Sequence, residues 1–388
     1  MTGERFALVA GGGTAGHLQP ALAIAEALVD AGHARDTIEF VGSERGQDRT
    51  ALDGRGFPFT LLPGRGIVRS LAPRDLATNL GAVVGLAWAL VRGVGVVVRS
   101  RPRVVVSVGG YASLAASTAA VLLGVPLVLV NVDAVPGAAN RLFGRFARAS
   151  AVGWGDNPLP RAVVTGTPVR PEIAAVRRHP ADRRAARRQL GLPEDRATVA
   201  VFGGSLGARR INEAAAGLAD AWADRADRSL YHVVGRRDWE AGEVATGAPA
   251  PGVGAGDGLR VVRVPYEERM DLLYTAADLV VCRAGAMTVA ELAVAGVPSV
   301  LVPLPGAPGD HQTANARVLE RAGATVVLAD ADCESENLAV TLDRMLADPV
   351  ELDAMGRAAS SLGRRDAARA GAQLVEANAR RPRHPVTR

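Results

Sequence analysis

Cysteine is scarce in this chain, which argues against a disulfide-stabilised protein and against a cysteine-based metal site. The 388 residues hold only two cysteines, Cys282 and Cys333. Two cysteines are too few for a disulfide framework or for a cysteine-based metal site, so we expect a reducing, cytoplasmic environment. The first residues also lack the basic-then-apolar pattern of a secretion signal, and we expect none there.

Aromatic residues are also few, at 4% of the sequence against 48% hydrophobic residues in all. This composition argues against an aromatic platform for single-stranded bases, and no nucleic-acid-binding motif is present, so we expect no nucleic acid partner. The formal net charge of +5 suits an anionic membrane surface or a phosphorylated substrate, or it reflects solvated arginines. The length and hydrophobic content predict two folded domains.

Long uncharged runs are absent too, and one stretch, from Leu80 to Val98, approaches the length of a membrane span. It contains Trp88 and one charged residue, Arg92, and arginines flank it on both sides. An arginine deep in lipid is costly, and glycines lower the helix propensity of this stretch. We therefore favour a buried or membrane-surface helix over a transmembrane one. As a surface helix it would dock on an anionic, cytoplasmic membrane surface.

Short apolar strands alternate with helices through both halves of the chain. In the first half we expect strands at residues 6–10, 38–41, 104–108 and 127–130, with helices at 18–31 and 113–123. In the second half we expect strands at 198–202, 231–234, 259–264, 279–281 and 299–302, with a helix at 208–221. Such alternation predicts parallel sheets whose two faces are covered by helices joined through right-handed crossovers. Each half is thus expected to be a doubly wound α/β domain.

A change of composition marks the boundary between these halves. Residues 165–171 contain two prolines and a glycine, which stop regular structure. The following run, residues 177–188, is dense in arginine and alanine. We interpret this run as a solvated helix that precedes the second domain.

The most informative segment is residues 282–291, which follows an expected buried strand at 276–281 and opens a helix. A strand, a turn of small residues and a helix start form an anion site, because free backbone N–H groups and the positive end of the helix dipole point at the ligand. Glu291 lies about one turn beyond Thr288, where a carboxylate can bond sugar hydroxyls. The segment therefore indicates a sugar nucleotide, with phosphates on residues 285–288 and ribose on Glu291.

Three glycine-rich loops follow expected strands. Residues 11–17 fit the Gly-x-Gly-x-x-Gly dinucleotide fingerprint, which is a weak signal alone, and they end in His17, which is either a general base or a helix cap. In residues 203–208 the hydroxyl of Ser205 can donate to a phosphate or a sugar, or it caps a tight turn. Residues 109–113 form the third loop, at a strand end where parallel sheets bind ligands.

Two further positions are candidates for ligand binding. Arg170, just beyond the boundary proline, could reach a diphosphate, or it is a surface arginine. Gln312 is a neutral donor and acceptor suited to sugar hydroxyls. Asp310 and His311 are adjacent without a third ligand, so we expect no metal site there and interpret Asp310 as a helix cap.

Taken together, these motifs resemble the MurG family of UDP-N-acetylglucosamine transferases of peptidoglycan synthesis, in glycosyltransferase family 28. The resemblance covers roughly residues 6–360 and is most specific at 283–291; the other matching segments are 11–17, 109–111, 135–137, 140–141, 166–170 and 203–208. It implies a GT-B architecture of two Rossmann-like domains facing a cleft. The implied domains are 1–168 for the acceptor and the membrane, 169–365 for the UDP-sugar, and 366–388 as a helix returning to the first domain with a basic tail.

The resemblance also implies a reaction and its partners. An inverting transferase would move GlcNAc from UDP-GlcNAc to the 4-hydroxyl of undecaprenyl-linked muramyl-pentapeptide, turning lipid I into lipid II for the cell wall, cell shape and division. The enzyme would lie peripherally on the cytoplasmic face of the cell membrane and need no metal or cofactor, since helix N-termini and Arg170 can stabilise the leaving UDP. His17 would be the base or would orient the acceptor. The family's motifs place UDP-GlcNAc on Thr14, Ala15, Gly16, Arg170, Ser205, Ala286, Met287, Thr288, Val289, Ala290, Glu291 and Gln312.

The chain departs from this family at residues 130–133, where His-Glu-x-Asn is usual and Val-Asn-Val-Asp stands here. Asn131 cannot accept a proton as a carboxylate can. We expect Asp133 to restore the charge and to serve both catalysis and substrate binding; alternatively, a related GT-B enzyme uses another lipid or natural-product acceptor. Leu206 also replaces a usual Gln, which removes one polar contact near the donor sugar. A nucleotide-sugar-binding protein without activity and an NAD(P)-dependent enzyme are further hypotheses.

Overall fold

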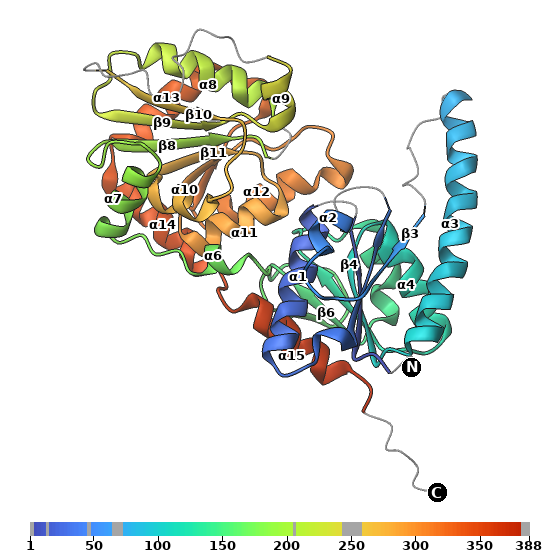
Figure 1. The fold of residues 1–388 in the computed structure, drawn as a ribbon. Helices are drawn as coiled ribbons and strands as arrows, with labels where there is room; N and C mark the ends of the chain where they lie inside the picture. Colours follow the sequence, from blue (N-terminus) through green and yellow to red (C-terminus); the bar gives the residue numbers. More distant parts are fainter. Residues whose placement is uncertain are drawn as a thin grey trace, which may run out of the picture. The chain divides into compact units, whose positions relative to one another are not determined.

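The computed structural model of the chain describes residues 4–12, 15–44, 48–63, 73–204, 207–242 and 258–381. It divides into two compact units, each built on its own parallel sheet. One unit combines Met1–Arg170 with Asp366–Arg388, and the other is Pro171–Arg365. In both units, helices cover the sheet (Figure 1). The predicted fold class, two doubly wound Rossmann-like α/β domains, is confirmed.

The sheet of the first unit has seven parallel strands in the order β3-β2-β1-β4-β5-β6-β7. In chain order the strands are β1 (Ala7–Gly11), β2 (Ile38–Ser43), β3 (Phe59–Leu62), β4 (Val104–Gly109), β5 (Leu127–Asn131), β6 (Ala149–Val152) and β7 (Ala162–Val164). β1, β2, β4 and β5 are buried along their whole length, as near-continuous apolar strands are when both sheet faces are covered. The strand order reverses between β1 and β4, which is where open parallel sheets bind ligands.

The stretch from Leu80 to Val98 lies within one 28-residue helix, α3 (Pro73–Ser100), which packs along α4 (Tyr111–Leu122). A Cβ on Gly93 would lie only 2.9 Å from the Cβ of Ala115, so this glycine lets the two helices approach closely despite its low helix propensity. Among the described residues, no helix combines the length and hydropathy needed to cross a membrane.

A second helix pair in this unit joins the two ends of the chain. α15 (Ala367–Asn378) packs along α1 (Ala15–Asp30), and Gly371 faces the side chain of Ile24. His33 Nε2 lies 2.9 Å from Glu376 Oε1. The last described helix is therefore part of the first unit's structure. The short helices α2 (Asp48–Leu52) and α5 (Ala138–Phe143) also belong to this unit.

The second unit repeats the same strand pattern in six parallel strands, ordered β10-β9-β8-β11-β12-β13. They are β8 (Ala197–Phe202), β9 (Arg228–Val233), β10 (Arg260–Val264), β11 (Leu279–Cys282), β12 (Ser299–Leu301) and β13 (Thr325–Val327). Its helices are α6 (Pro171–Ala174), α7 (Pro180–Gln189), α8 (Arg209–Ala221), α9 (Arg236–Glu240), α10 (Met270–Ala276), α11 (Ala286–Ala295), α12 (His311–Arg321), α13 (Ser335–Leu346) and α14 (Pro349–Leu362). The order reverses between β8 and β11, so ligand-binding loops are expected after these two strands.

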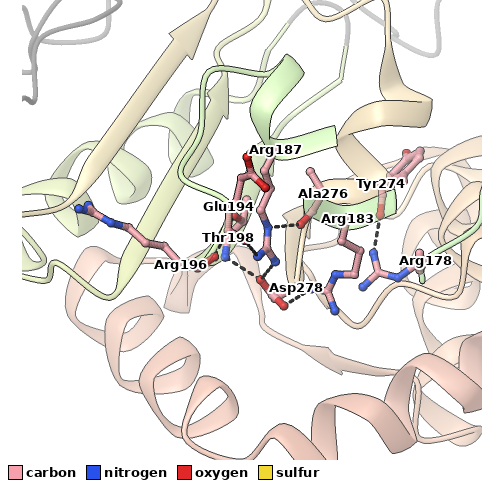
Figure 2. A network of polar contacts seen from close by, with 9 residues as sticks. All are labelled: Arg178, Arg183, Arg187, Glu194, Arg196, Thr198, Tyr274, Ala276 and Asp278. Carbon is pink, nitrogen blue, oxygen red and sulfur yellow. Dashed lines mark hydrogen bonds and ion pairs between the residues drawn. The ribbon is translucent and has the colours of Figure 1, made fainter. Parts of the chain in front are cut away.

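One prediction about this unit is wrong, and another holds in part. The expected strand at 276–281 begins only at Leu279, because Ala276 ends α10. The run at 177–188 is helical from Pro180 and largely exposed, but Arg187 of α7 is buried and donates to Asp278 at 2.6 Å, and Arg183 pairs with the same carboxylate (Figure 2). The physical reason is that a carboxylate at the start of a buried strand requires cations around it.

Candidate functional site

The imidazole of His17 lies against the backbone of Gly109 and Gly110. Because α1 starts at Ala15, soon after β1 ends, His17 stands in the first turn of this helix and is half-buried. A Cβ on Gly109 would lie 3.0 Å from His17 Nε2, and one on Gly110 would lie 3.4 Å from His17 Nδ1 and 2.6 Å from the carbonyl oxygen of Gly12. Both glycines also have positive φ angles, 105° and 83°. The structure thus brings the first and third glycine loops together around the histidine.

The turn after β5 is organised by a buried amide. Asn131 donates to the main-chain oxygen of Asp133 at 2.6 Å and accepts from Asn140 Nδ2 at 3.1 Å. Its side chain therefore shapes the turn, and as an amide it supplies no acid or base. Asp133 is half-buried, at the same carboxyl edge of the sheet as His17.

A cavity of about 520 Å³ lies at the carboxyl edge of the second sheet. Glycines of the loop after β8, the start of α11 and the start of α12 border it. Its lining includes Gly203, Gly204, Gly207, Arg209, Arg210, Arg237, Arg283, Gly285, Thr288, Leu304 and Gln312. Closely approaching backbone, a helix N-terminus and four arginines are features that suit phosphate groups.

The residues of helix α11 that are predicted to bind the donor lie on different faces of the helix. Gly285 precedes the helix, and Thr288 in its first turn faces the cavity. Val289 and Ala290 are buried in the core, at 0% and 3% exposed. Their side chains therefore face away from any ligand, because successive helical residues point in different directions. Ala286 and Met287 are half-buried at the start of the helix.

The carboxylate of Glu291 is held by a tyrosine in the core. Tyr274 is fully buried, and its hydroxyl donates to Glu291 Oε2 at 2.9 Å. The tyrosine ring in turn meets the ring of Phe202 edge-on, with 6.2 Å between centroids. Glu291 is thereby presented in a fixed orientation one turn along α11 from Thr288.

Gln312 joins the cavity through its side chain, whereas its neighbour Asn315 supports the backbone. The Oε1 of Gln312 accepts from the N–H of Leu304 at 2.9 Å, which leaves its amide nitrogen as a donor. Asn315 is buried and donates to the carbonyl oxygen of Ala284 at 3.2 Å, just before the start of α11.

Comparison with known proteins assigns the family. The model of the glycosyltransferase family 28 N-terminal domain matches residues 7–152, and that of the glycosyltransferase family 28 C-terminal domain matches residues 198–370. The chain belongs to glycosyltransferase family 28. Its relatives include proteins of Acidothermus cellulolyticus, 40% identical, and of Nocardioides sp., 41% identical; each match covers 95% of this chain and 96% of the relative. Both relatives are named UDP-N-acetylglucosamine–N-acetylmuramyl-(pentapeptide) pyrophosphoryl-undecaprenol N-acetylglucosamine transferase.

Solved structures place this family 28 chain in the GT-B class. MurG of Acinetobacter baumannii matches with a TM-score of 0.74 and 26% identity, over 97% of this chain and 100% of that one. The glycosyltransferase of kitacinnamycin matches with a TM-score of 0.66 and 17% identity over 97% and 99%, which shows a shared fold. The predicted resemblance to the MurG family is confirmed.

Several predicted site residues of this family 28 chain stay predictions. Thr14 and Ser205 lie outside the described residues, as does the side chain of Ala15. Gly16 lies half-buried beside His17. Arg170 ends the first unit, and its role toward a diphosphate stays a prediction.

Sequence reasoning missed the arginines of the cavity as site residues. Arg209 and Arg210 open α8 directly after the glycine loop, a position that the loop motif itself could have indicated. Arg283 donates to the carbonyl oxygen of Val302 at 3.1 Å and to Asp330 Oδ1 at 2.5 Å, so its guanidinium is fixed at the cavity wall.

A buried polar network behind the glycine loop was also missed. Asn212 donates to the main-chain oxygen of Val234 at 3.0 Å and to Asp238 Oδ2 at 2.9 Å, and it accepts from His232 Nε2 at 2.9 Å. A Cβ on Gly207 would lie 2.3 Å from the same Asp238 oxygen, so the loop rests directly on this network. Burial, with Arg263 nearby, lowers the pKa of His232 to about 3, so this histidine is neutral.

Proposed function

We propose that this chain moves GlcNAc from UDP-GlcNAc to the 4-hydroxyl of undecaprenyl-linked muramyl-pentapeptide, converting lipid I to lipid II in peptidoglycan synthesis. The observation that carries the proposal is its identity of 40% and 41%, over nearly the full length of both chains, to two transferases named for this reaction. The arginine-lined cavity of the second unit supports it with a site of the right chemistry for the donor.

Residues in and beside the cavity suit the diphosphate, the ribose and the sugar of the donor. The start of α11 and the loop containing Gly207 offer backbone N–H groups to the diphosphate, and the helix dipole adds favourable potential. Glu291, held by Tyr274, is oriented to accept from ribose hydroxyls. The amide nitrogen of Gln312 is a donor for a hydroxyl of the sugar.

The proposed chemistry is a single displacement with inversion. The acceptor oxygen bonds to the anomeric carbon, the bond from that carbon to the β-phosphate oxygen breaks, and the hydroxyl proton passes to the imidazole of His17. Backbone donors and arginines stabilise the charge that develops on UDP, so the proposal needs no metal or cofactor. Asp133 is the second candidate for interaction with the acceptor or donor.

Helix α3 supports a peripheral position on the cytoplasmic face of the membrane. From Trp88 onward its exposed residues recur at helical spacing, with Trp88 57%, Val91 62% and Val98 54% exposed, and Arg92 is exposed between them. Val97 and other residues of the opposite face are buried against α4. An apolar stripe with an arginine beside it suits insertion into the headgroup region of an anionic leaflet.

The decisive assay gives purified protein UDP-GlcNAc and a lipid I analogue and follows UDP release and the disaccharide product. We expect turnover, and a fall in kcat of about 10²- to 10⁴-fold in His17→Asn with UDP affinity kept. Full activity in His17→Asn would remove the histidine from the mechanism. Turnover on a soluble acceptor alone, with none on the lipid, would overturn the proposed function.

The second candidate function is a related GT-B transfer to a different acceptor. The observation behind it is that Asn131 is neutral and engaged with Asn140 and the backbone of Asp133. The wild type discriminates the two, because transfer to another acceptor with none to lipid I would favour the second function. Asp133→Asn then tests the carboxylate: lost transfer would assign it to the reaction, whereas unchanged transfer would remove it from acceptor chemistry.

A further inference from the structure

A second arginine-rich cavity, of about 490 Å³, lies in the second unit at the opposite end of β11 from the donor cavity. Asp278, which lines it, precedes β11, whereas Arg283 of the donor cavity follows the same strand. The new cavity lies between α7, the end of α11 and α14, and Gly296, Gly356 and Ser360 are among its lining residues. Its volume falls within the range of small-ligand sites.

Positive charge dominates the lining of this cavity. Five arginines face two aspartates: Arg177, Arg178, Arg183, Arg357 and Arg365 against Asp278 and Asp353. Both carboxylates already form ion pairs with arginines. Asp353 pairs with Arg357 on α14. Asp278 pairs with Arg183 and with buried Arg187, and it also accepts from the N–H of Thr198 at 2.7 Å (Figure 2).

Within the part of the chain that the structure describes, the guanidinium groups of Arg177, Arg178 and Arg365 donate hydrogen bonds only to main-chain carbonyl oxygens. Arg177 donates to the carbonyl oxygen of Val176 at 3.0 Å, and Arg365 donates to the same oxygen at 2.8 Å. Arg178 donates to the carbonyl oxygen of Tyr274 (Figure 2). Carbonyl oxygens satisfy donors without supplying negative charge, so three cations gather here without carboxylates of their own.

The electrostatic cost of this arrangement appears in the pKa values. Burial, with Arg183 nearby, lowers the pKa of Arg178 to about 9. Burial and the neighbouring Arg177 also lower the pKa of Arg365. Asp278 offsets part of the effect on Arg178, and a bound anion would add negative charge beside both arginines.

We propose that this cavity binds a small soluble anion bearing a diphosphate group. A guanidinium carries five N–H donors, so the three arginines keep donors beyond those spent on carbonyl oxygens. Their planar groups match phosphate oxygens, and the hydroxyl of Ser360 adds a donor from α14. A diphosphate carries several negative charges, which can balance the positive charges of the three arginines that lack carboxylate partners.

Titration calorimetry with inorganic pyrophosphate tests this proposal in the full-length chain. The test variant is Arg177→Gln with Arg365→Gln, and the control is Arg210→Gln, which alters the donor cavity. We expect a saturable pyrophosphate site that weakens at least tenfold in the double variant and keeps its affinity in the control, since each lost guanidinium contact to phosphate is a charge-assisted hydrogen bond.

Two results would overturn the proposal: unchanged pyrophosphate affinity in the double variant, or displacement of pyrophosphate by equal concentrations of chloride or sulfate. Far-ultraviolet circular dichroism checks that the double variant folds. If it does not, the single variant Arg177→Gln replaces it, because Arg177 is exposed and a glutamine there leaves the core intact. Pyrophosphate can also enter the donor cavity, and the Arg210→Gln control separates the two sites, because it alters the donor cavity and leaves the second cavity unchanged.

Discussion

Removing one hydroxyl from the core should weaken UDP binding, because Tyr274 holds the carboxylate of Glu291 in place. The hydroxyl donates to Glu291 Oε2 at 2.9 Å, and Tyr274 itself is fully buried. A hydrogen bond to a charged group contributes about 1.5–3 kcal/mol. Since 1.4 kcal/mol is about tenfold in affinity, we expect Tyr274→Phe to weaken UDP binding by about ten- to a hundredfold. The phenylalanine keeps the ring packed against Phe202, so the fold should survive.

The assay is a double-mutant cycle by titration calorimetry with UDP, using wild type, Tyr274→Phe, Glu291→Gln and the double variant. If the tyrosine acts only through Glu291, the double variant binds UDP no more weakly than Glu291→Gln alone. Tyr111→Phe is the matched control, because its hydroxyl bonds the carbonyl oxygens of Pro63 and Gly85 in the first unit. If the losses of the two single variants multiply in the double variant, or if Tyr274→Phe binds UDP as the wild type does, the tyrosine does not act through Glu291.

Three other perturbations test separate parts of the structure. Gly110→Ala places a side chain on a backbone with φ of 83°, which costs about 1–3 kcal/mol of strain, and its Cβ would point toward His17. We expect glycosyl transfer to be lost while UDP affinity is kept, which kcat and the Kd for UDP measure separately. Asp278→Asn leaves buried Arg187 without its counter-charge and should lower the free energy of unfolding in urea by about 3 kcal/mol. His232 has a folded pKa near 3 against 6.5 when unfolded, so only the unfolded chain takes up its proton as the pH falls below 6.5. Stability should then fall by up to about 1.4 kcal/mol per pH unit, and His232→Gln should flatten this slope in unfolding curves between pH 6 and 4.

Sequence patterns predicted the elements whose structure is determined by residues adjacent in the chain. β1, β4 and β8 are mostly apolar runs with glycines at or after their ends, and the anion site proposed at α11 follows from strand, turn and helix in one segment. β6 was missed because its residues, Ala-Ser-Ala-Val, carry little β-branched or aromatic signal. The short β3, β7 and β13 were missed as well.

What the sequence could not reveal depends on residues far apart in the chain. The burial of Arg187 is decided by Asp278, which lies ninety-one residues further on. The need for glycine at Gly109 is decided by His17 on another element. In α3, Gly93 lowers helix propensity when considered alone, yet it serves the packing on Ala115. Each case requires the pairing of elements to be known first.

We propose that the second unit binds the sugar diphosphate and that His17 of the first unit serves the acceptor. A crystal structure of the chain with UDP tests the donor site. We expect phosphate oxygens within hydrogen-bonding distance of the backbone N–H groups of residues 285–288, and the ribose hydroxyls on Glu291. UDP bound instead along residues 11–16, with the cavity at Gly285 and Thr288 empty, would contradict it.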